Sequence, residues 1–71
     1  MPKLTREQLI THCVHGLQDF GYSAVNQENI FTDFVYSQFF IRMLKNGLGE
    51  GYDDLIQSLI QEVEEKQSKT L

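Results

Sequence analysis

The segment from Ile30 to Leu44 constrains the fold of this chain more than any other. On a helical wheel its apolar residues occupy both sides: one side carries Ile30, Phe34, Ile41 and Leu44, and the other carries Val35, Tyr36, Phe39 and Met43. Phe31 and Phe40 extend the apolar surface further, and no polar stripe is left. A helix that is apolar all round is a buried helix. We therefore expect this segment to lie at the centre of the fold, with its neighbours covering its flanks.

The first helix is expected over residues 6–20. Thr5 and Gln8 have the spacing of a capping box, in which each side chain bonds the other residue's backbone amide. The apolar residues that follow form one stripe, as a helix packed on one side requires: Leu9, Ile10, Cys13, Val14, Leu17 and Phe20. Gly21 then provides a helix stop.

The central helix is expected over residues 27–46, and two different caps can start it. Asn26 is one, and Thr32, followed by the favourably charged Asp33, is the other. The two can coexist as a short turn followed by the main helix. The aromatic and β-branched residues from Phe34 to Ile41 leave a strand as the alternative, although their alternation is poor and the neighbouring segments are helical.

Gly47 is expected to end the central helix in the left-handed conformation of a Schellman motif, with Leu48 folded back on Met43. A third helix is expected over residues 52–66, again with one apolar stripe, and residues 67–71 are expected to fray. The chain is thus predicted to be all-α. It is expected to form one small three-helix domain over residues 1–71, with the central apolar helix 2 flanked by helices 1 and 3.

A chain of 71 residues is near the lower limit for a self-sufficient core. Cys13 is the only cysteine, so no disulfide within the chain reinforces the fold, and oligomerisation is the remaining common remedy. The start of the chain has no apolar stretch like that of a signal peptide, and no segment is long enough to span a membrane. These features predict a cytoplasmic protein without a membrane partner.

The formal charge of -4 argues against a nucleic-acid partner, because such proteins present a basic patch and the six cations here are scattered. No catalytic constellation is recognised, and no cofactor is expected. The small size and acidity are typical of the accessory or regulatory proteins that phages and mobile elements encode.

His12, His15 and Asp19 share one face of the first helix, and their side chains are types that bind transition metals. A zinc site takes three or four protein ligands, and no matching second set is present. A solvated polar face is therefore the favoured interpretation, and a metal-binding helical protein is an alternative. Cys13 lies within the apolar stripe, which favours a buried core thiol over a nucleophile.

The third helix carries an exposed acidic face that includes Glu62 and Glu65. Such a face is ordinary for a solvated helix, but it also suits an inhibitor that mimics nucleic acid on a partner protein. The favoured hypothesis is a non-enzymatic protein-interaction module that forms a homodimer or larger homo-oligomer. Its contact is expected to come from the central helix, through Tyr36, Phe39, Phe40 and Met43.

Overall fold

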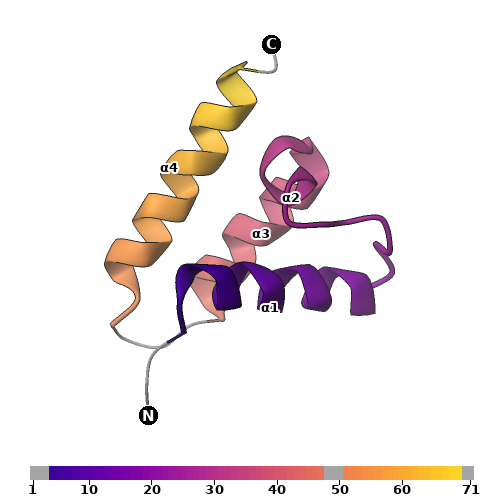
Figure 1. Ribbon diagram of the computed structural model, residues 1–71, viewed down its shortest axis with the longest axis horizontal. Helices are drawn as coiled ribbons and strands as arrows, with labels where there is room; N and C mark the ends of the chain where they lie inside the picture. The colour runs from indigo at the N-terminus through magenta and orange to yellow at the C-terminus, as the bar shows by residue number, and fades with distance from the viewer. Residues whose placement is uncertain (1–3, 48–50, 70–71) are drawn as a thin grey trace.

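The computed structural model describes residues 4–47 and 51–69, and all regular secondary structure in these ranges is helical (Figure 1). The helices are α1 (Arg6–Asp19), α2 (Asn29–Thr32), α3 (Phe34–Asn46) and α4 (Asp53–Lys69). The predicted all-α class is confirmed, and the strand alternative is wrong because its residues lie in α3. The expected central helix is not continuous, since it is divided into α2 and α3.

The start of α1 follows the expected capping box. The Thr5 hydroxyl accepts a hydrogen bond from the Gln8 amide at 3.2 Å, and the Gln8 side chain accepts one from the Thr5 amide at 3.0 Å. Two orphan amides of the first turn are satisfied in this way. After α1 the chain turns at Gly21, whose φ of 115° favours glycine. The predicted start and stop of this helix are confirmed.

The division of the central helix occurs at Asp33, whose extended backbone (φ -76°, ψ 130°) interrupts the helical run. Its carboxylate accepts hydrogen bonds from the amides of Val35 and Tyr36 at 2.9 and 3.0 Å and so caps α3. The Asn26 side chain meanwhile accepts bonds from the two amides that lead into α2, at 2.8 and 2.9 Å. Both expected starts therefore exist, with Asp33 in place of Thr32 as the second cap.

The ends of the last two helices differ from expectation. Gly47 has a φ of -103°, so the left-handed conformation predicted for it is wrong, and Leu48 lies outside the described residues. Helix α4 continues to Lys69 instead of ending near residue 66. Gln67 holds this last turn in place because its side-chain amide donates to the Ser37 hydroxyl and to the carbonyl of Phe31. Residues 70 and 71 lie outside the described range.

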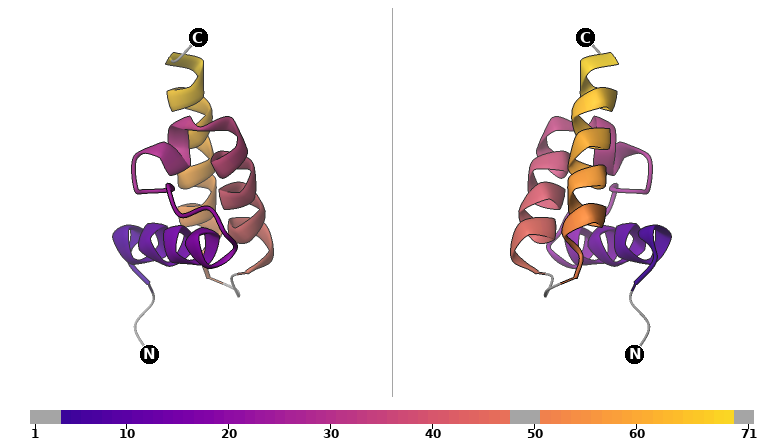
Figure 2. Two further views of the ribbon diagram at one scale, coloured as in Figure 1. Left: turned by 90° about the vertical axis from the view of Figure 1, so that its right-hand side faces the viewer. Right: turned by 90° about the vertical axis from the view of Figure 1, so that its left-hand side faces the viewer.

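The core is formed where α2, α3 and α4 come together above α1, which runs across the base of the other helices (Figures 1 and 2). Its centre is an edge-to-face pair of Phe31 and Phe40, whose ring centroids lie 5.3 Å apart. The other buried apolar residues are Leu9, Ile10, Cys13, Val14, Leu17, Val25, Ile30, Leu44, Leu59 and Val63. Within the described ranges, no helix combines the length and hydropathy needed to cross a membrane.

Candidate functional site

One side of α3 faces away from the rest of the protein, and we call it the α3 outer face. At 100° per residue its exposed side chains fall within a stripe about 120° wide: Phe34, Val35, Gln38, Arg42, Lys45 and Asn46. Phe34 is 69% exposed and Val35 48%. The stripe also holds polar residues, so the expectation that this helix has no polar stripe is wrong.

The phase of α3 explains why these two large apolar residues lie outside. Ser37, Phe40 and Leu44 have no exposed surface and form the buried side of the helix. The Asp33 cap fixes Phe34 as the first helical residue, about a quarter-turn away from that buried side. Val35 lies one residue further round and points still more fully away from the core. The sequence therefore places two large apolar side chains on the surface at the start of α3.

The four residues expected to form the contact have different surroundings. Phe40 has no exposed surface and belongs to the core. Tyr36 and Phe39 are half-buried, because Tyr22 from the connector after α1 packs on both, with ring centroids at 5.8 and 5.3 Å. The connector thus covers a flank of the central helix that we expected a partner to cover.

Met43, the fourth expected contact residue, is half-buried where α3 passes α1. It packs against Gly16, where an added Cβ would lie only 2.6 Å from the methionine methyl. Glycine at this position lets the two helices approach closely. Met43 therefore contributes mainly to the packing of α3 on α1.

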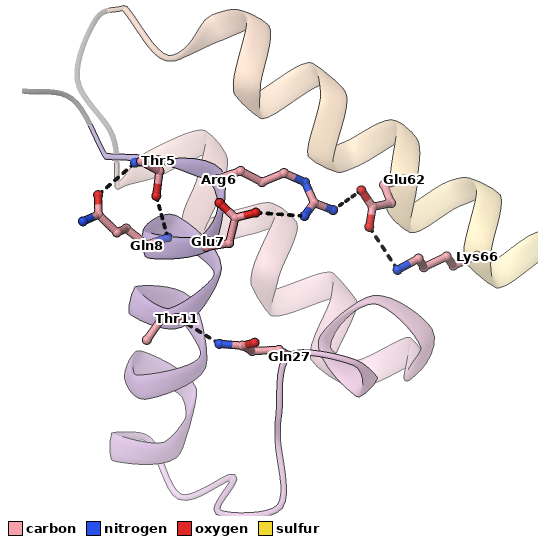
Figure 3. A network of polar contacts seen from close by, with 8 residues as sticks. All are labelled: Thr5, Arg6, Glu7, Gln8, Thr11, Gln27, Glu62 and Lys66. Atoms are coloured by element: carbon pink, nitrogen blue, oxygen red, sulfur yellow. Dashed lines mark hydrogen bonds and ion pairs between the residues drawn. The ribbon is translucent and has the colours of Figure 1, made fainter.

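The cations of the chain differ in their surroundings. Arg6 and Lys66 both form ion pairs with Glu62, and this network links α1 to α4 (Figure 3). Both cations also lie over the Phe31 ring, at 5.9 and 4.5 Å from its centroid. On the α3 outer face, by contrast, neither Arg42 nor Lys45 forms an ion pair with any described residue. Two positive charges without an ion-pair partner in residues 4–47 and 51–69 therefore share a face with the exposed apolar residues.

The ion-pair network removes Glu62 from the acidic surface of α4. Partial burial raises the pKa of this carboxyl, but hydrogen bonds and charge from Arg6 and Lys66 outweigh burial and hold the pKa below its usual range. Glu65 is exposed and accepts only a long hydrogen bond of 3.4 Å from Gln61. The two residues expected to act together in a nucleic-acid mimic thus have different roles.

The expected metal candidates lie on the exposed side of α1, where His12, His15 and Asp19 are all accessible. In residues 4–47 and 51–69, no three histidine, cysteine or acidic side chains are placed to hold a metal ion together. The shared helix face thus brings these residues to one side of α1 without forming a ligand set.

A cavity of about 340 Å³ lies between α1 and α3, and Cys13, His12 and Arg42 contribute to its wall. Burial raises the pKa of the Cys13 thiol to about 11, so the thiol is protonated at neutral pH. A protonated, buried thiol is a packing group and not a nucleophile. The structure places this cysteine in the core, as the sequence predicted.

Phe34 and Val35 were absent from the contact residues inferred from the sequence. The spacing of Gln38, Arg42 and Lys45 was the available signal, because these three polar residues mark one side of α3 and the two apolar residues lie on that side.

In the comparisons with known proteins, no family, no curated protein and no solved structure matches this chain.

Proposed function

We propose that this protein is a small, non-enzymatic protein-interaction module that self-associates through the α3 outer face. The observation that supports this most is the exposure of both Phe34 and Val35 in the first turn of a helix whose other large apolar residues are buried or half-buried. Covering the exposed part of Phe34 alone would contribute roughly 1–2 kcal/mol per copy. A contact between copies through this face would cover both side chains and join them into one larger apolar interface.

A second copy of the chain is the proposed occupant because the domain is small. Chains of this size gain stability by sharing apolar surface between protomers. In a two-fold symmetric contact the same patch is used twice, so each exposed residue contributes twice to the interface. Phe39, half-buried and one helical turn beyond Val35, extends the patch.

Sedimentation velocity over a range of protein concentrations tests this proposal. The wild-type sedimentation coefficient is expected to rise with concentration, and a Phe34→Gln/Val35→Gln double variant is expected to remain monomeric. Circular dichroism verifies that the variant keeps its helices, which we expect because both side chains are exposed. Phe20→Gln is the matched control, since Phe20 is 82% exposed but lies at the end of α1. A monomeric wild type at every concentration, or equal weakening by Phe20→Gln, would contradict the proposal.

A further inference from the structure

The two ends of the α3 outer face differ in chemistry. The first turn presents Phe34 and Val35, with the Asp33 carboxylate at the helix start. The last two turns present Arg42 and Lys45, which have no ion-pair partner among the described residues. The face therefore runs from an aromatic and acidic end to a basic end. Such a polarity limits how two copies can pack against each other.

Parallel packing of two α3 helices is unfavourable on this face. It would place Arg42 on Arg42 and Lys45 on Lys45 of the second copy, and it would align the two helix dipoles. Antiparallel packing instead brings each basic end to the aromatic and acidic end of the other copy. A guanidinium over an aromatic ring is a favourable contact, and this chain already places Arg6 and Lys66 over the Phe31 ring.

From this self-complementarity we infer that two copies pack α3 against α3 in antiparallel orientation, about a two-fold axis that passes beside Gln38. Phe34 and Arg42 each lie four residues, or about 6 Å, from Gln38 in opposite directions along the helix. The axis therefore brings Phe34 of one copy level with Arg42 of the second copy, 40° to the other side of Gln38, so that the long arginine side chain reaches across to the ring, and the reverse contact forms by symmetry. Lys45 then lies beside the start of the second copy's α3, where Asp33 carries a negative charge. This arrangement rests on the proposed self-association.

Disulfide cross-linking under mild oxidation distinguishes the arrangements. Helices packed about 9–10 Å apart bring facing Cα atoms to about 4.4–5.4 Å, which a disulfide can bridge. We expect Gln38→Cys to form a covalent dimer, because the axis places this position opposite itself. Lys45→Cys should stay monomeric, since its two copies lie about 20 Å apart along the helices. Gln57→Cys, at an exposed glutamine on α4, is the matched control and should not cross-link.

A mixing experiment tests the register directly. Phe34→Cys and Arg42→Cys should each fail to cross-link alone, because either position is about 12 Å from its own copy along the helix. An equimolar mixture of the two variants should give the covalent dimer. The native thiol does not interfere, because Cys13 is buried and protonated at neutral pH. Wild-type protein under the same oxidation provides the baseline.

The contribution of the Arg42 charge to the affinity between the two copies is tested by Arg42→Gln. Lys69→Gln on α4 is the control for the loss of one positive charge. Two symmetric guanidinium–ring contacts at an exposed site predict that Arg42→Gln raises the dimer dissociation constant about 5- to 30-fold. The control should leave the constant unchanged.

Three results would overturn this arrangement. Cross-linking of Lys45→Cys as readily as Gln38→Cys would show parallel packing. A wild type that dimerises in sedimentation while Gln38→Cys does not cross-link would place the axis at another register or the contact on another face, and would leave self-association itself intact. A monomeric wild type in the same sedimentation runs would overturn both this arrangement and the proposed function.

Discussion

Phe40 and Phe34 offer a sharp test of which side of α3 is core and which is surface. They lie on the same helix, six residues apart, and differ in exposure from 0% to 69%. The perturbation is the same truncation to alanine at each position. A difference between the two variants therefore reports the surroundings of each ring and not the chemistry of the substitution.

The expected magnitudes differ several-fold. Removing a fully buried phenylalanine ring costs about 3–5 kcal/mol, because transfer free energy is lost and a cavity remains. A chain of 71 residues has a total stability of about 4–11 kcal/mol, so Phe40→Ala removes a large share of it. Phe34→Ala should change the free energy of unfolding of the monomer by no more than about 0.5 kcal/mol.

Urea unfolding followed by circular dichroism measures both changes, in dilute protein so that association does not contribute. Phe40→Leu, with an expected loss of about 1–2 kcal/mol, keeps the comparison possible if Phe40→Ala does not fold. At high concentration the wild type should gain stability by mass action and Phe34→Ala should gain less. Equal losses at Phe34 and Phe40 in dilute protein would refute the assignment of the two faces.

Three further predictions concern caps and titratable groups. The pKa of Glu62 lies below its ordinary value of 4.5 in the folded chain, so its carboxylate stabilises the fold above that value and the contribution is lost as the pH falls through the folded pKa. The difference between the urea midpoints at pH 7 and pH 3 should therefore be smaller for Glu62→Gln than for wild type. For Glu65→Gln this difference should equal that of wild type. Asp33→Ala should cost about 1 kcal/mol in thermal or urea unfolding and Asp33→Asn much less, because asparagine also caps; equal losses would count against the cap. A thiol reagent at neutral pH should label Cys13 only after denaturation, and fast labelling of the native protein would contradict its burial.

The helical class and the first helix could be predicted because they depend on local chemistry. The Thr5 and Gln8 side chains satisfy amides only three residues away, and a single apolar stripe requires one packed face. The sequence predicts two possible starts for the central helix, and both exist, since Asn26 and Asp33 each satisfy nearby amides, although the second cap is Asp33 and not the expected Thr32. Local signals were sufficient for these features.

Two local predictions are wrong, the left-handed Gly47 and the Thr32 cap, and the other missed features depend on contacts between distant residues. Helix α4 extends past residue 66 because Gln67 bonds Ser37, thirty positions earlier in the chain. Tyr22 covers Tyr36 and Phe39 from a connector that has no periodic pattern of its own. Helical periodicity alone marked α3 as apolar all round, but it does not specify which of its residues the rest of the chain covers.

The most direct measurement of the central claim is the concentration dependence of backbone amide chemical shifts in ¹⁵N-labelled protein. If the α3 outer face is the contact between copies, the amides of Phe34, Val35, Gln38, Arg42 and Lys45 shift progressively as the protein is concentrated. The amides of the outer side of α4, such as those of Gln57 and Glu65, stay in place. Shifts that are absent at every concentration, or that map to α4 instead, would contradict self-association through α3.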